Sequence, residues 1–114
     1  MTQEEKELLL KDLCARQPYG VKVVYLATTF TVQYVDSRFD EVKLEGMPHT
    51  VDISCIKPYY RPMSSISSLI SAKEWSSLSG IDLIDWYNAN HIDYRGLIKK
   101  GFAIEAPKNT YTNL

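Results

Sequence analysis

Residues 41–55 read EVKLEGMPHTVDISC, and this stretch decides the fold class. Val42 and Leu44 alternate with charged residues, which is the pattern of a strand with one buried and one solvated face. Residues 46–49 (Gly-Met-Pro-His) are a turn signal, and after them the apolar side chains of 51–55 again occupy every second position. Two alternating segments joined by a short turn predict antiparallel strands.

The same period of two continues upstream. Residues 21–26 and 30–35 are rich in Val, Tyr and Phe, with a break in the alternation at 27–29 and a turn signal at 36–40. Regular strands separated by turns predict a small antiparallel meander sheet. We expect this sheet to be curled or barrel-like.

An amphipathic helix precedes the sheet. Thr2 and Glu5 have the spacing of a capping box, in which each side chain bonds the backbone amide of the other. Leu9 and Leu13 then lie four residues apart on one helix face. The Pro-Tyr-Gly sequence at 18–20 ends the helix.

Short helices are predicted after the sheet. Residues 64–79 are rich in serine, and Ser71 with Glu74 forms a second candidate capping box. Residues 81–90 predict a further helix. Because large aromatic side chains dominate core burial, we expect those of this region to build the core between helices and sheet. They are Trp75, Trp86 and Tyr87.

The C-terminal part predicts a helix, a glycine stop and a strand. Asp93 is a good N-cap for a helix over 94–100, and Gly101 suits the left-handed residue that ends it. Phe102, Ile104 and Ala106 predict a short strand that pairs at a sheet edge.

Composition indicates one soluble globular domain. The chain has 114 residues, 45% of them hydrophobic and 24% charged, with a net charge of −1. No apolar run reaches the roughly 18 residues of a membrane span, and the acidic start does not resemble a signal peptide. We therefore predict a cytoplasmic α+β domain over 1–107, followed by a polar C-terminal tail at 108–114.

The two cysteines are Cys14, in the first predicted helix, and Cys55, at the end of a predicted strand. Nothing in their spacing requires a disulfide. We expect two buried or half-buried thiols in a reducing cytosol.

Three blocks of this sequence resemble an uncharacterised family of small proteins from gut anaerobes and their mobile elements, the prophages and conjugative transposons. The blocks are 4–16 continuing through 18–21, then 56–59 with 61–65, then 84–86 with 93–98, 101 and 106–107. Between the blocks, the β region and residues 64–80 depart from the family pattern. The resemblance implies cytoplasmic expression and a mobile-element origin, and it supplies no catalytic residue.

The residues capable of chemistry are few. His91 and Asp93 could share a metal ion or act as an acid–base pair, but a metal site needs three or four ligands and only His49 remains as another histidine. Cys55 could pair with His49 across a turn. The sequence contains neither a Gly-x-Ser-x-Gly nucleophile motif nor a glycine-rich phosphate loop. We therefore predict no catalytic residue, no metal and no cofactor.

The best candidate for binding is the proline-framed segment 57–62, in which two tyrosines lie between two cations. The candidate residues are Lys57, Tyr59, Tyr60 and Arg61. Tyr and Arg are enriched in protein interfaces, and aromatic rings beside cations can also stack bases and contact phosphates. The structural alternative is that one tyrosine packs on the sheet while Arg61 pairs with a nearby carboxylate or carbonyl group.

The sequence therefore predicts a non-enzymatic binding or adaptor protein of mobile-element origin that acts on a protein partner. The alternative is a nucleic-acid-binding accessory protein that uses the same aromatic and basic residues, although the near-neutral charge argues against it. A third hypothesis is that the protein is a small enzyme. Exposed sheet edges leave a homo-oligomer open as well.

Overall fold

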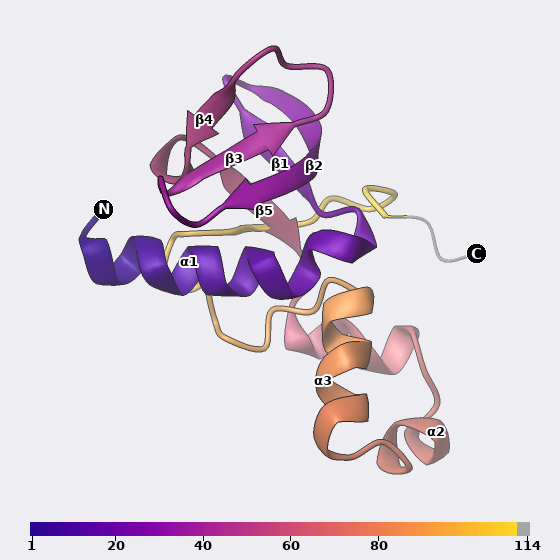
Figure 1. Cartoon of the computed structure of the whole chain (residues 1–114). Helices are drawn as coiled ribbons and strands as arrows, with labels where there is room; N and C mark the ends of the chain where they lie inside the picture. Colours follow the sequence, from indigo (N-terminus) through magenta and orange to yellow (C-terminus); the bar gives the residue numbers. More distant parts are fainter. Residues whose placement is uncertain (112–114) are drawn as a thin grey trace.

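The computed structural model describes residues 1–111 of the chain and has an α+β architecture (Figure 1). In chain order its elements are α1 (Gln3–Arg16), η1 (Gln17–Tyr19), β1 (Lys22–Tyr25), β2 (Thr28–Asp36), β3 (Glu41–Leu44), β4 (Thr50–Asp52), η2 (Ile53–Cys55), β5 (Lys57–Tyr60), η3 (Met63–Ser68), α2 (Ala72–Ser76), α3 (Gly80–Ala89) and β6 (Ile104–Glu105), where η denotes a 3-10 helix. The predicted fold class is confirmed.

Helix α1 begins as its sequence predicts. The Glu5 amide donates to Thr2 Oγ1 at 3.2 Å, and the Thr2 amide donates to Glu5 Oε1 at 2.7 Å. Both halves of the capping box are therefore present, and they satisfy two amides that the helix cannot pair internally. Gly20, with φ +68°, turns the chain out of η1 and into the sheet.

The sheet has the strand order β4-β3-β2-β1-β5-β6. Strands β1 to β4 pair antiparallel with their neighbours in sequence, which confirms the predicted meander. Strand β5 returns to pair antiparallel with β1, and β6 adds a short parallel edge beside β5. The prediction of a final strand at a sheet edge is therefore also confirmed.

The expectation of a curled or barrel-like sheet is wrong. A barrel closes when its two edge strands pair with each other, and here the edges are β4 and β6, at opposite ends of the strand order. Strand β4 has three residues and β6 has two, so neither offers a ladder long enough to close the sheet. The alternation in the sequence predicts the strands themselves, whereas closure depends on where the edge strands come to lie.

One hydrophobic core joins α1 to the sheet. Helix α1 contributes Leu9, Leu10 and Leu13, each at most 5% exposed. Strands and turns supply the rest of this cluster, which comprises Val21, Val23, Val32, Val42, Leu44, Ile53, Ile56, Tyr60, Leu97 and Ala103. The helix therefore covers one face of the sheet, as Figure 1 shows.

Residues 62–90 form what we call the helical arm, comprising η3, α2 and α3. The Glu74 amide donates to Ser71 Oγ at 3.2 Å, so the predicted cap of α2 is present. Helix α3 lies where the sequence predicts it, beginning at Gly80. In Figure 1, α2 and α3 lie beyond α1, on the side away from the strands.

The predicted aromatic core of this region is only partly correct. Tyr87 is buried and Trp86 is half-buried, whereas Trp75 is 38% exposed. Within the ten residues of α3, Tyr87 and Asn88 alone are buried. The arm therefore makes little core of its own, because it projects from the sheet instead of lying over it.

The predicted helix over 94–100 is wrong, because the segment is a series of turns. Gly96 has φ +71°, which breaks a right-handed helix. Asp93 still caps the segment, since its carboxylate accepts from the amides of Leu97 at 2.8 Å and Ile98 at 2.9 Å. Gly101 has φ +84°, in the left-handed region that the sequence predicts for it.

The predictions for the two cysteines and for the C-terminal tail differ from the structure in part. Cys14 and Cys55 are both exposed and unbridged, so the prediction of buried or half-buried thiols is wrong. Of the predicted tail at 108–114, residues 108–111 are described and Tyr111 packs against the sheet. Residues 112–114 lie outside the described part of the chain.

Candidate functional site

Alternation along β5 separates the four predicted binding residues. Pro58 and Tyr60 point into the core, whereas Lys57 is exposed and Tyr59 is half-buried on the opposite face. Arg61 follows at the strand end and is also half-buried. The sequence places the two tyrosines together, but the pleat of the strand sends them to opposite faces.

Tyr60 lies in the interior and is 0% exposed. The guanidinium carbon of Arg16 lies 4.1 Å from the centre of its ring, an arrangement that allows a cation–π interaction. Burial, with a further contribution from the nearby Asp12 carboxylate, raises the pKa of the Tyr60 hydroxyl well above its ordinary value. The Tyr60 side chain is therefore part of the scaffold and does not reach the surface contact expected for it.

A buried ionic cluster surrounds Tyr60. Arg16 Nε lies 3.0 Å from Asp12 Oδ2, and both side chains are fully buried. Arg95 Nε approaches Asp12 Oδ1 at 2.9 Å from the half-buried side. Arg16 Nη2 also donates to the Ile92 carbonyl at 2.6 Å. One carboxylate thus faces two guanidinium groups, and the cluster ties α1 to residues 92–95.

The sequence analysis does not identify this cluster. The available signal is the i, i+4 spacing of Asp12 and Arg16 on the side of α1 that carries Leu9 and Leu13. A charged pair on an apolar helix face indicates a buried ion pair when a partner segment covers it. The covering segment is 92–95, nearly eighty residues further along the chain, so α1 alone does not reveal it.

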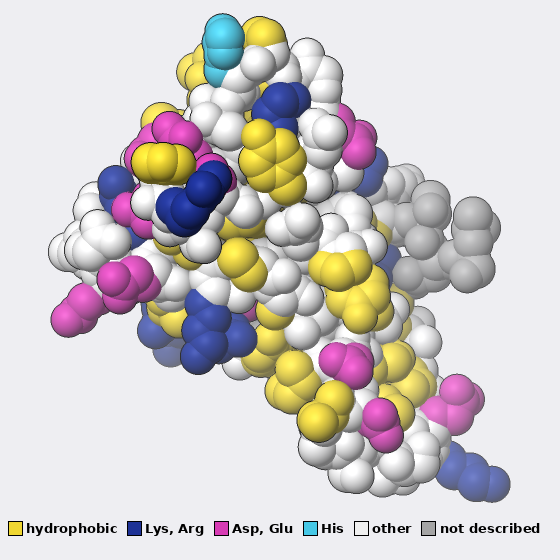
Figure 2. Space-filling model, viewed as in Figure 1, with side chains coloured by type: hydrophobic (Ala, Val, Ile, Leu, Met, Phe, Trp, Pro, Cys, Tyr) yellow, Lys and Arg dark blue, Asp and Glu magenta, His cyan; other side chains and the backbone are white. Residues whose placement is uncertain are grey.

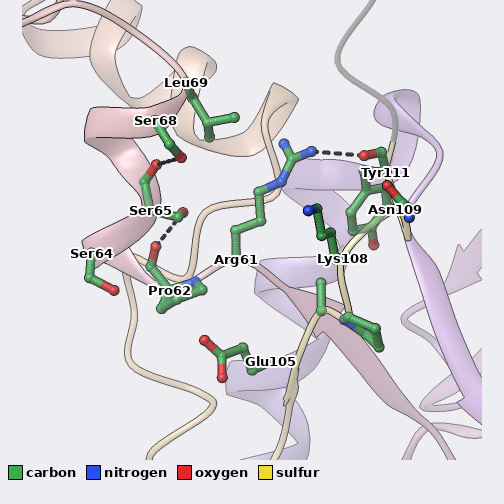
Figure 3. Close-up of a pocket in the computed structure, with 12 residues that line it drawn as sticks. Arg61, Pro62, Ser64, Ser65, Ser68, Leu69, Glu105, Lys108, Asn109 and Tyr111 are labelled. Atoms are coloured by element: carbon green, nitrogen blue, oxygen red, sulfur yellow. Dashed lines mark hydrogen bonds between the residues drawn. The ribbon is translucent and has the colours of Figure 1, made fainter.

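Arg61 lies between two hollows on the outer side of β5. Its Nη1 donates to the Asn90 carbonyl and its Nη2 to the Tyr111 carbonyl, both at 3.1 Å. Figure 3 shows the guanidinium pointing toward Tyr111, with Lys108 and Asn109 beside it. The local pairing of Arg61 that the sequence analysis left open as an alternative is therefore present.

The larger hollow measures about 700 Å³ and lies between η3 and residues 105–111 (Figure 3). It is lined by serine side chains of η3, by Glu105 and by Lys108 as well as by Arg61. Ser65 Oγ donates to the Pro62 carbonyl, and Ser68 Oγ donates to the Ser65 carbonyl, each at 2.7 Å. The hydroxyls of Ser65 and Ser68 therefore stabilise the turn of η3.

His91 lies beside Arg61 and is 5% exposed, so it is buried although it lies in a turn. Its ring stacks on Tyr111, with ring centres 3.6 Å apart. Burial, followed by the charges of Arg16, Arg61 and Lys22, lowers the pKa of His91 to about 3. The imidazole is therefore neutral at physiological pH.

The helical arm carries an apolar groove of about 390 Å³ between η3 and α2. Its apolar lining residues are Met63, Ile66, Ile70, Ala72 and Trp75. On α3, Ile81 is 78% exposed and Ile84 is 42% exposed. Figure 2 shows hydrophobic side chains, in yellow, across the part of the surface that α3 occupies in Figure 1.

The other candidate chemistry does not come together. In residues 1–111, no group of three His, Cys, Asp or Glu side chains is placed to hold a metal ion. His49 is exposed, whereas His91 and Asp93 are buried and serve the turn after α3. Desolvation by the surrounding protein raises the pKa of the Cys14 thiol even though the residue is exposed, and this makes it less reactive as a nucleophile.

Comparison of the chain with protein-family models, with curated proteins and with solved structures finds no match. The resemblance to a mobile-element family therefore stays a prediction. No helix in residues 1–111 has the length and apolar composition that crossing a membrane requires.

Proposed function

We propose that this protein is a non-enzymatic binding protein that acts through contacts with another protein. The supporting observation is the exposed apolar surface of the helical arm. Its groove and the two isoleucines of α3 expose large hydrophobic side chains, whose contact with water is unfavourable in free energy. Exposed apolar surface is a feature of protein-binding sites.

The shape of the arm supports the same function. Helix α3 is apolar in sequence (Gly80–Ala89, GIDLIDWYNA), yet it packs on the rest of the chain mainly through Tyr87 and Asn88. An apolar helix in a globular protein usually buries a whole face. A partner that covers Ile81 and Ile84 would complete this burial.

A matched pair of variants tests this function. Trp75 in the arm and Tyr34 on the sheet are exposed to nearly the same extent, 38% and 40%. In affinity capture from cells that express the gene, Trp75→Ser is expected to lose a partner that Tyr34→Ser retains. Recovery of the same partners with both variants would show that the arm is not the interface. Circular dichroism of each variant verifies that the fold is intact.

Nucleic-acid binding is a second candidate, and the outer face of the β1–β5 pair supports it. Lys57, Tyr59 and Arg61 lie on this face, and Lys22 joins them from β1 across the antiparallel ladder. Single-stranded oligonucleotides should then bind with an affinity that falls steeply as salt rises. Absence of binding at low salt would reject this candidate. Mobile-element origin and cytoplasmic localisation remain predictions from the resemblance.

A further inference from the structure

A second hollow, on the other side of Arg61 from the one in Figure 3, combines concave shape with positive charge. It measures about 430 Å³ and shares Arg61, Asn109 and Tyr111 with its larger neighbour. Lys22 and Arg61 are the charged residues that line it, and none of its described lining residues carries a carboxylate. The sequence gives no sign of this site, because Lys22 lies on β1 whereas Arg61 follows β5, far along the chain.

The fold fixes the walls of this hollow. The Tyr111 hydroxyl accepts from the Lys22 amide at 2.9 Å and donates to the Tyr59 carbonyl at 2.7 Å, so it bridges β1 and β5. The Arg61 guanidinium is oriented by the carbonyls of Asn90 and Tyr111. A side chain that is already ordered loses less conformational entropy when a ligand binds.

His91 lies beside the same positive charges. It lines the hollow, and its Nδ1 has no hydrogen-bond partner among the described residues. Burial is the largest cause that disfavours protonation of its ring, and the charges of Arg16, Arg61 and Lys22 add to it. Within residues 1–111, Lys22 belongs to none of the ion pairs. An anion placed here would relieve this concentration of positive charge.

We propose that this hollow binds the phosphate group of a small phosphorylated molecule, with Lys22 and Arg61 contacting the phosphate oxygens. A phosphate monoester carries close to two negative charges at neutral pH, which matches two cations better than a single carboxylate does. The hollow is larger than a phosphate group alone, and its volume falls within the range of small-molecule sites. Tyr19 and Asn109 line it and can donate further hydrogen bonds.

The two histidines of the chain provide a reporter of phosphate binding and an internal reference. His91 lines the hollow, and His49 is exposed in the turn between β3 and β4. We expect inorganic phosphate, titrated at constant ionic strength, to shift the imidazole NMR signals of His91 saturably and to leave those of His49 unchanged. Equal shifts of both histidines would overturn the proposal.

A matched lysine pair then tests the contact itself. Lys22 lines the hollow, whereas Lys57 lies on the same face of the sheet without lining it. Lys22→Gln is expected to weaken phosphate binding by ~10-fold, the cost of one charge-assisted hydrogen bond, and Lys57→Gln to leave it unchanged. Equal weakening by both variants would show diffuse attraction without a site. Thermal unfolding verifies that both variants fold.

A third experiment distinguishes the two possible sources of the phosphate group, a small molecule and a nucleic acid. A small phosphate monoester such as glycerol phosphate should compete with inorganic phosphate for the His91 shift, with the same dependence on Lys22. A single-stranded oligonucleotide that competes more strongly than the monoester, and that loses affinity equally in Lys22→Gln and Lys57→Gln, would overturn the small-molecule assignment in favour of nucleic acid.

Discussion

The guanidinium of Arg16 lies 4.1 Å from the centre of the Tyr60 ring, and both side chains are completely buried. This contact joins the last turn of α1 to the end of β5. Since Asp12 and the Ile92 carbonyl also bind Arg16, one side chain links the helix, the sheet and the C-terminal turns. Three parts of the chain that are far apart in sequence therefore depend on the same charge.

We expect Asp12→Ala to lower the free energy of unfolding by about 3–5 kcal/mol, because it leaves the buried Arg16 charge without its carboxylate. Asp36→Ala is the matched control. It removes an ion pair to Arg38, whose side chain is 79% exposed, and should cost less than about 1 kcal/mol. Denaturant unfolding measures both, and equal losses would contradict the central role of the Arg16 pair.

Tyr60→Phe should leave the free energy of unfolding unchanged or raise it by up to about 1–3 kcal/mol. The Tyr60 hydroxyl is buried without a hydrogen-bond partner in residues 1–111, and removing an unsatisfied group removes its desolvation cost. Tyr60→Ala removes the ring beneath Arg16 and should cost about 3–5 kcal/mol. A large loss on Tyr60→Phe would show that the hydroxyl has a stabilising partner.

The pKa of His91 predicts a loss of stability in mild acid. Its pKa is about 3 in the folded chain against 6.5 ordinarily, so between these pH values the unfolded chain binds a proton that the folded chain does not. Stability therefore falls as the pH is lowered through this window, by about 2 kcal/mol between pH 7 and pH 5.

Comparing the free energy of unfolding of the wild type with that of His91→Gln at pH 7 and pH 5 isolates this contribution. The variant should lose less stability than the wild type between the two pH values. A His91→Gln profile parallel to that of the wild type would refute the assignment.

Asp93→Ala should destabilise the turns after α3 by about 2–3 kcal/mol, since the amides of Leu97 and Ile98 both donate to this carboxylate. Hydrogen exchange of these two amides is the direct measurement, and it should accelerate more than that of the core amides of β1. Asp85→Ala, at an exposed position of α3, serves as the control. Unchanged exchange at Leu97 and Ile98 would mean that backbone bonds alone hold the turn.

The correct predictions concern features that a few neighbouring residues decide. Thr2 with Glu5 and Ser71 with Glu74 cap their helices because each pair is three residues apart and needs nothing else. The meander follows from period-two alternation for the same reason. The candidate site was harder to predict, because it combines Lys22, Arg61, His91 and Tyr111 from four separate segments.

By itself, the sequence determined the order of helix, meander, short helices and final strand, since hydrophobic period and capping act over one or two turns of chain. Only the tertiary structure decided that Tyr60 faces inward under Arg16, that the sheet stays open and that Trp75 faces solvent. The physical reason is that a side chain is buried only where two surfaces of the folded chain come into contact. A side chain joins the core only when a distant segment covers it, and no local sequence pattern specifies which segment that is.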